Sequence, residues 1–351
     1  MNRLIILLFL LIPVSLMAQT EVIPGVMRGK DYGVVYTLPK TEIDLEIHAM
    51  KIVYTPGEFS RYADRYLRLT DVSGQPSEYW ELGAIEIKTV GVPDASETYF
   101  VKLKDKTVAP LIGLTDDGII ESINVPYTKD QPLPAEELVP AQKRKIDPRS
   151  FLTEEILITS SSAKMAELIA KEIYNIRESK NALLRGQADN MPKDGAQLKL
   201  MLDNLNEQEQ AMTEMFAGTY EREEKVFNIR VVPDKEFTDR VAFRFSKKLG
   251  ILPEDDLAGE PFYLTLKDMK SVIIPEDDGK GKKAEGIAYN VPGRGSVTLT
   301  NGNKTIVSGE IAVTQFGTKE FLAPVLFNKK STVKVVFNPD TGGLVKVDRE
   351  E

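Results

Sequence analysis

Apolar and polar residues alternate along much of the chain, which is the pattern of half-buried strands. Across residues 41–54, Ile43, Leu45 and Ile47 would lie on one face of a strand and acidic side chains on the other. The alternation loses its phase near residues 50–51, which predicts a bulge or a bend. Further strand-like runs follow at 80–90, 99–103, 108–114 and 119–125.

The period changes after Pro56-Gly57, where a short helix is predicted. Its apolar face, which we expect to pack against the sheet, consists of Phe59, Tyr62, Ala63, Tyr66 and Leu67.

The opposite face of this short helix carries Arg61, Arg65 and Arg68, with Glu58 and Asp64 between them. Such arginines form a docking patch in some proteins, because Arg is common at the centre of protein interfaces. The alternative is a solvated face, on which Glu58 pairs with Arg61 and Asp64 with Arg68.

Two long helices are predicted in the middle of the chain. The serine hydroxyls at 160–162 can cap the first helix, whose pattern extends to Leu184. Asp194 can cap a second helix, which ends where Gly218 follows Ala217. Each would be about 35 Å long at roughly 1.5 Å per residue. The short connection makes them antiparallel neighbours in an α-hairpin.

These patterns predict an α+β fold that is mainly β, with two β-sandwich-like units and a long antiparallel α-hairpin between them. The predicted divisions are a first β-rich domain with one short helix at 26–126, a Pro-rich linker at 127–150, the α-hairpin at 151–218 and a second β-rich domain at 219–351. Both β-rich domains end in a strand, an acidic turn, a glycine and an apolar strand, at 114–120 and 337–345. This is the pattern of an internal duplication, and the alternative is that such a turn recurs by chance in unrelated hairpins.

Residues 1–18 have the features of a secretory signal peptide. Arg3 supplies a positive charge, an apolar run follows, and Ala18 is a small residue at the expected cleavage point. The run is about 13 to 15 residues, shorter than the roughly 20 that a membrane anchor needs. We therefore expect an exported protein, in the periplasm or associated with the outer membrane, with no direct membrane insertion after the signal is cleaved.

The composition excludes several kinds of chemistry. The chain has no cysteine and one histidine, His48, so disulfides, cysteine nucleophiles, lipid attachment to cysteine and two-histidine zinc sites are excluded. No metal or other cofactor is expected. The formal net charge of −8 argues against nucleic acid as a partner.

Several short sequence motifs resemble the domain-of-unknown-function family numbered 4831. They occur along the chain from residue 38 to residue 317, so the resemblance extends over nearly the whole mature chain. They are LPKT at 38–41, PGEFSRYA at 56–63, AKMAE at 163–167, IRES at 176–179, MPKDG at 191–195, FAG at 216–218, RFS at 244–246 and QFG at 315–317. The resemblance implies an exported protein of Bacteroidetes-type bacteria. It supplies no catalytic residue.

Two acidic residues fall within the apolar stripes of the predicted helices, Glu172 on the first and Glu209 on the second. Folding the hairpin near residue 190 would bring them to one level. They could then share a proton or hold a cation, because two close buried acids cannot both stay ionised. In the alternative, one acid reaches the edge of the stripe and the other meets a basic residue such as Arg177.

We therefore predict an exported, non-catalytic cell-envelope protein that acts through contact with another envelope protein. The alternative is a carbohydrate-binding or glycan-cleaving protein, which would need a groove lined by aromatic rings such as Trp80 or Tyr99 and a pair of acids. Under that alternative the ligand is a glycan or another small molecule.

Overall fold

The computed structural model describes residues 21–24, 33–102, 111–125, 147–273, 286–323 and 332–350. It is mainly β with three antiparallel sheets, which confirms the coarse prediction from the sequence. The predicted signal peptide and most of the Pro-rich linker lie outside the described residues.

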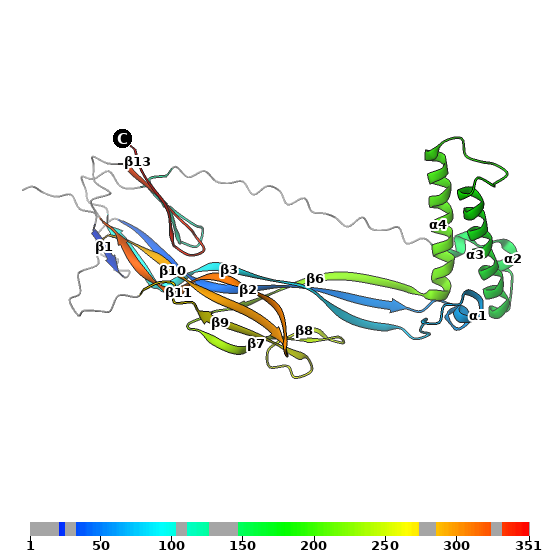
Figure 1. Ribbon diagram of the computed structural model, residues 1–351, viewed down its shortest axis with the longest axis horizontal. Coiled ribbons are helices and arrows are strands. Elements are labelled where there is room, and N and C mark those ends of the chain that lie inside the picture. Colours follow the sequence, from blue (N-terminus) through cyan, green and yellow to red (C-terminus); the bar gives the residue numbers. More distant parts are fainter. Residues whose placement is uncertain are drawn as a thin grey trace, which may run out of the picture.

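The first sheet has the strand order β1-β3-β2-β6. Its strands are β1 (Glu21–Pro24), β2 (Gly33–Thr55), β3 (Ser77–Lys102) and β6 (Thr219–Val231). The ends of β2, β3 and β6 extend beyond the other sheets as a three-stranded arm (Figure 1). We define the arm as residues 49–55, 77–82 and 219–225.

The second sheet has the order β11-β10-β9-β7-β8 and the third β13-β12-β5-β4. The second contains β7 (Phe237–Ser246), β8 (Gly250–Leu252), β9 (Glu260–Asp268), β10 (Ile287–Asn301) and β11 (Lys304–Leu322). The third contains β4 (Ile112–Leu114), β5 (Ile120–Ile123), β12 (Thr332–Phe337) and β13 (Leu344–Glu350).

Strand pairing crosses between the two predicted β-rich domains. The strand β6 pairs with β2, and β12 pairs with β5, so each pair joins a strand before the long helices to one after them. The two domains therefore share two of the three sheets. Alternation identifies a strand and its buried face, but it carries no information about the neighbouring strand.

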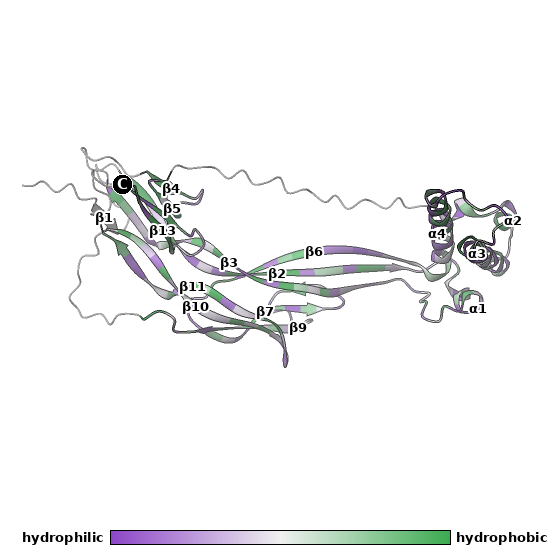
Figure 2. Ribbon diagram, turned by 45° about the horizontal axis from the view of Figure 1, so that its top comes forward, coloured by the Kyte–Doolittle hydropathy of each residue, from purple (hydrophilic) through white to green (hydrophobic). Residues whose placement is uncertain are grey.

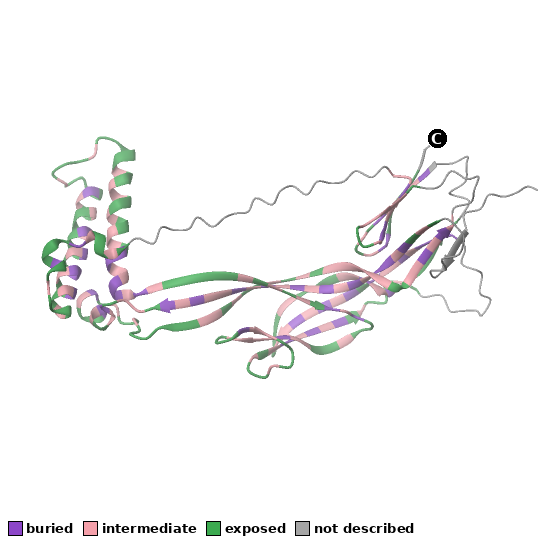
Figure 3. Cartoon of the chain, turned by 180° about the vertical axis from the view of Figure 1, so that it is seen from behind, coloured by how far each residue is buried: buried purple, intermediate pink, exposed green. Residues whose placement is uncertain are grey.

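The main β core lies between the first and second sheets. Ile43, Leu45 and Ile47 are fully buried there against Phe243 and Leu264. Burial alternates along β2 as far as Ala49 and resumes in the opposite phase at Ile52, which confirms the predicted break at 50–51. Buried and more exposed residues alternate along several of the long strands (Figure 3). Hydrophobic and hydrophilic residues alternate along the same strands (Figure 2).

A buried polar contact joins β2 to β11. Thr41 is fully buried, and its backbone N–H donates to Oγ1 of Thr314 at 2.9 Å. In return, the N–H of Thr314 donates to Oγ1 of Thr41 at 3.0 Å. The side-chain amide of Gln315 donates to the carbonyl of Thr41 at 2.8 Å. The strands β2 and β11 belong to different sheets and do not pair as neighbouring strands. These bonds satisfy their backbone groups at the point where the two sheets are in contact.

The helices gather in a head at the end of the arm (Figure 1). The head comprises η1 (Ser60–Tyr62), α1 (Ala63–Leu67), η2 (Pro148–Phe151), α2 (Glu154–Leu157), α3 (Ser162–Leu184) and α4 (Gly195–Ala217). Ser161 caps α3 by accepting from Lys164 N, and Asp194 caps α4 by accepting from Gln197 N. No helix in the described part of the chain is long and apolar enough to cross a membrane.

The core of the head contains the apolar residues of the short helix. Phe59, Ala63 and Leu67 are buried with residues of α3 and α4, including Ile173 and Phe216. The prediction that this face packs against the sheet is therefore wrong. The 3.6-residue period shows that one face of the short helix is apolar, but it does not show what covers that face. The long helices α3 and α4 lie at the same end of the arm and cover it.

The joint between arm and head is close-packed. Tyr54 is 2% exposed, and its hydroxyl lies 2.8 Å from the carbonyl oxygen of Ser73 and 3.0 Å from that of Ala217, so its one proton can be donated to either. Gly218 follows with φ +80°, and a Cβ there would lie 2.4 Å from the carbonyl oxygen of Thr55. A side chain at residue 218 would therefore push the head away from the arm.

The solvent face of β2 carries the single histidine. His48 Nδ1 lies 2.9 Å from Glu224 of β6, and Nε2 lies 3.3 Å from Glu46 on the same strand. The hydrogen bond with Glu224 raises the pKa of His48, desolvation opposes it, and Glu46 adds to the rise.

The two acidic turns noted in the sequence lie in the same sheet, because β5 pairs with β12. Each turn also accepts a hydrogen bond from a strand of another sheet. The N–H of Thr37 in β2 donates to Gly118 O at 2.9 Å, and the N–H of Asn290 in β10 donates to Gly342 O at 3.0 Å. Both donor residues stand two positions before a proline.

We expect Thr41→Val to lower the free energy of unfolding by about 1–3 kcal/mol, because it removes the acceptor of the partly buried Thr314 N–H. Chemical denaturation of the two proteins measures the difference. Thr238→Val, at an exposed position of β7, is the control and should change stability by less than about 0.5 kcal/mol. Equal effects of the two substitutions would contradict the assignment.

We also expect a pH dependence that disappears in His48→Gln. Because the folded-state pKa of His48 is raised above 6.5, its contribution to stability is complete below that pH and is lost as the pH rises through the raised pKa. Unfolding free energies from about pH 5 to about pH 8 measure the loss. An NMR titration of the single imidazole gives its pKa directly, and a value below 6.5 would refute the expectation.

Candidate interaction surface

The short helical segment that follows the arm determines where its arginines lie. Phe59, Ala63 and Leu67 are buried in the head, so the helix face that carries these three residues points inward. Arg61 and Arg65, which are four residues apart, therefore share an exposed face.

Each exposed arginine lies over the tyrosine that follows it. The Arg61 guanidinium carbon is 5.5 Å from the ring centre of Tyr62, and that of Arg65 is 5.3 Å from the ring centre of Tyr66. The two tyrosine rings are themselves 6.1 Å apart. These are cation–π distances, so the guanidinium groups are held against the rings rather than free in solution.

The helix α3 extends this surface. The hydroxyl of Tyr174 donates to the carbonyl of Tyr66 at 3.0 Å, and the Tyr174 side chain remains 47% exposed. The Arg177 guanidinium carbon lies 5.5 Å from the ring centre of Tyr174. We call these six residues the arginine–tyrosine surface: Arg61, Tyr62, Arg65, Tyr66, Tyr174 and Arg177.

An ion-pair cluster between α3 and α4 holds one end of the surface. Arg177 Nε donates to Glu209 at 2.6 Å, and Lys180 Nζ donates to the other oxygen of Glu209 at 2.7 Å. Desolvation raises the pKa of Glu209, but the hydrogen bonds from Lys180 and Arg177 outweigh it and hold the pKa below its usual value. Glu209 therefore acts as a charged anchor that orients Arg177.

Glu172 and Glu209 have separate partners in the structure. Glu172 accepts a hydrogen bond from Asn175 of its own helix at 3.1 Å, whereas Glu209 binds Arg177 and Lys180. The arrangement is the alternative considered from the sequence, in which one acid meets Arg177. No group of three or more His, Asp or Glu residues in the described part of the chain could hold a metal ion.

The predicted pairing of Glu58 with Arg61 is wrong. Glu58 lies 3.1 Å from Arg149, which comes from η2, and Arg61 lies over Tyr62. The short helix also ends early, because Arg68 has a left-handed backbone conformation with φ +58°. Spacing along an ideal helix therefore could not supply the partners of these side chains.

The two aromatic residues proposed for a glycan groove are engaged inside the protein. Trp80 packs edge-on against Phe227, Lys225 lies over its ring, and a Cβ at Gly250 would lie 3.0 Å from the indole. Tyr99 is 6% exposed and stacks on a second tyrosine. Tyr99 is therefore too buried to stack on a sugar, and the partly exposed Trp80 ring already has Phe227, Lys225 and Gly250 as neighbours.

The three tyrosines of the surface were missed as functional residues in the sequence, where Tyr62 and Tyr66 were assigned to an apolar face and Tyr174 was given no role. A signal was present, because the dipeptide Arg-Tyr occurs at 61–62 and again at 65–66. Two such dipeptides four residues apart place a repeated arginine–aromatic pair on one side of a helix.

A comparison with protein-family models identifies the family of this chain. The family model described as Domain of unknown function (DUF4831) matches residues 32–345. The chain belongs to the DUF4831 family. The match confirms the resemblance seen in the sequence, and it includes the arm, the head and the arginine–tyrosine surface. No curated protein matches the chain, and no solved structure does.

In this DUF4831 protein we expect Glu209→Gln to lower the free energy of unfolding at pH 7 by about 1–2 kcal/mol, since it weakens two charge-assisted hydrogen bonds that are partly exposed. Because the pKa of Glu209 is lowered on folding, this contribution is lost as the pH falls through the folded-state pKa. Denaturation at pH 7 and at successively lower pH should show the difference shrinking as Glu209 becomes protonated.

The matched control is Glu172→Gln, on the neighbouring helix. It removes a carboxylate whose partner is the neutral Asn175 and should cost less than about 0.5 kcal/mol at either pH. A cost for Glu172→Gln as large as that for Glu209→Gln would show that the two acids act together.

Proposed function

We propose that this DUF4831 protein is an exported, non-catalytic component of the cell envelope that works by contact with another envelope protein. The contact is made by the arginine–tyrosine surface. The observation that carries the proposal is the position of that surface, at the end of a three-stranded arm and away from the three sheets (Figure 1). A partner can therefore approach it without meeting the three sheets.

The residue types of the surface support a protein partner. Arg and Tyr are enriched among the residues that contribute most to binding at protein interfaces. Stacking of Arg61 on Tyr62 and of Arg65 on Tyr66 orders the side chains before binding, which reduces the entropy lost on association. Within the described part of the chain, neither Arg61 nor Arg65 forms an ion pair, so both charges are available to an acidic partner surface.

The proposed architecture for this role has two parts. The first and second sheets, which share one apolar core, form a sandwich that serves as the body. The helices α3 and α4 form an antiparallel hairpin, with the Glu209 ion pairs between them, and give the head its shape.

The test replaces Tyr174 with a photo-crosslinking amino acid in intact cells of the native host. We expect one discrete adduct with another envelope protein. Charge reversal by Arg61→Glu together with Arg65→Glu should reduce the adduct at least about tenfold, because like charges across an interface are repulsive. The yield is measured by quantitative mass spectrometry after cell fractionation.

The control variant is Arg185→Glu, which reverses an exposed charge at the C-terminal end of α3, outside the arginine–tyrosine surface. It should leave the adduct unchanged. Equal loss in both variants would assign the effect to net charge. Recovery of the protein from the cytoplasmic fraction, or of the monomer without adduct, would count against the proposal.

A further inference from the structure

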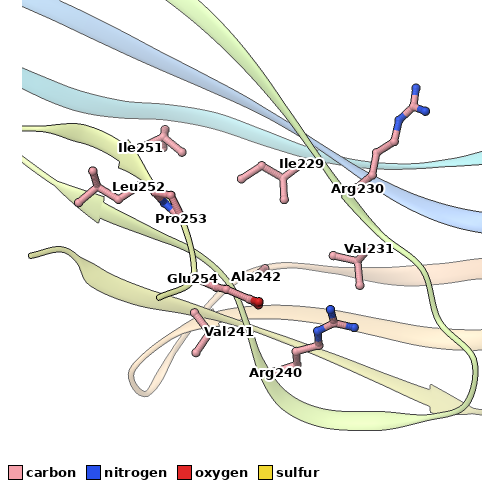
Figure 4. A pocket seen from close by; sticks show the side chains of 10 residues that line it. All are labelled: Ile229, Arg230, Val231, Arg240, Val241, Ala242, Ile251, Leu252, Pro253 and Glu254. Carbon is pink, nitrogen blue, oxygen red and sulfur yellow. The ribbon is translucent and has the colours of Figure 1, made fainter. Parts of the chain in front are cut away.

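A groove opens at one side of the sandwich, far from the arginine–tyrosine surface. It has a volume of about 390 Å³ and lies between β6 of the first sheet and β7 and β8 of the second (Figure 4). Its apolar lining consists of Ile229, Val231, Val241, Ala242, Ile251 and Leu252. Several of these side chains pack on the core between the sheets, so the groove is the place where that core reaches solvent.

Two sheet edges border the groove. The strand β6 is the last strand of the first sheet, and β8 is the last strand of the second. An edge strand has backbone N–H and C=O groups on its outer side without a strand partner, and proteins usually cover or shorten such edges. Here β6 is 13 residues long. The groove therefore combines an apolar floor with backbone groups that can pair with an added strand.

The wall formed by β7 is irregular. Its pairing with β9 shifts register between Phe237 and Arg240 and again between Val241 and Phe243. Asp239, which precedes the wall, has φ +52°, a conformation that is costly for a residue other than glycine. Bulges of this kind redirect side chains and are common next to functional sites. The three β7 residues that line the groove, Arg240, Val241 and Ala242, lie between Phe237 and Phe243, where these two shifts occur.

Three charged side chains line the groove, Arg230, Arg240 and Glu254, so its lining is basic by one charge. The guanidinium of Arg240 extends toward the side of Val231, whereas Arg230 is directed away from the apolar side chains (Figure 4). Within the described residues Arg240 has a cation–π contact with Phe237, 5.9 Å from the ring centre, and no carboxylate partner. A carboxylate of an incoming chain would complete the site.

We infer that the groove binds an extended segment of another polypeptide by strand addition to one of its two edges. The segment has apolar residues at alternate positions, which occupy the floor between Ile229 and Leu252, and an acidic residue beside Arg240. Backbone hydrogen bonds supply affinity and the alternate side chains supply specificity. This site is distinct from the surface on the head, so the protein holds two partners at opposite ends of the arm.

Disulfide trapping tests the inference directly, because the chain has no cysteine of its own. The full chain carrying Leu252→Cys is mixed with synthetic nine-residue peptides based on TVSVTISVE, each with one cysteine at a successive position that is supplied as its mixed disulfide with 2-mercaptoethanol. The introduced thiolate at position 252 attacks the peptide sulfur, and 2-mercaptoethanol leaves as its thiol. We expect capture at every second position, several times above that of Glu223→Cys, an exposed position on the arm part of β6. Val241→Cys is a second groove variant, in case Leu252→Cys fails to fold.

Two further experiments, one with a modified peptide and one with a protein variant, distinguish strand addition from nonspecific hydrophobic binding. A peptide with alternate backbone nitrogens methylated keeps its side chains but cannot pair, and its capture should fall to that of Glu223→Cys. Adding Arg240→Glu should reduce capture of the acidic peptide about tenfold and favour the same peptide ending in lysine. Capture that is equal at all positions, that survives methylation, or that does not exceed the Glu223→Cys level would overturn the inference.

Discussion

The structure depends on one continuous hydrogen-bonded ladder. The strand β2 pairs with β3 from Gly33 to Tyr54 and with β6 from Ile43 to Thr55, so the strands that build the body also build the arm. At roughly 3.3 Å per residue, the 23 residues of β2 extend about 75 Å. The pairing of β2 with β3 shifts register between Ile47 and Ala49, but the pairing of β2 with β6 runs without a shift from body into arm. The position of the head is therefore determined by backbone pairing rather than by a flexible linker.

Local features of this fold were predictable from the sequence. The alternation along β2, including its change of phase near residue 50, follows from the need to bury one face of a strand. The ends of α3 and α4 follow from capping, because Ser161 and Asp194 accept backbone N–H groups that a helix leaves free, and Gly218 accommodates a positive φ. Each of these outcomes is decided within a few residues of the chain.

Features that depend on distant residues were not predictable. The pairing of β6 with β2 is set by the return of α4 to the arm, which no local pattern encodes. Glu209 lies within an apolar stripe and still meets Arg177 and Lys180, because long basic side chains reach across from the neighbouring helix. The duplication suggested by the sequence stays a prediction, although Gly118 and Gly342 accept hydrogen bonds from β2 and β10 at corresponding points of their turns.

The arm also has a mechanical consequence. All three of its strands run covalently from the head into the first sheet, and each is already close to the greatest length that a polypeptide can reach, about 3.3–3.6 Å per residue. Tension between the two ends of the molecule therefore acts on nearly taut backbones instead of stretching a coil. The arm therefore transmits force with almost no extension. A displacement of the head is passed on to the first sheet instead of being absorbed by the arm.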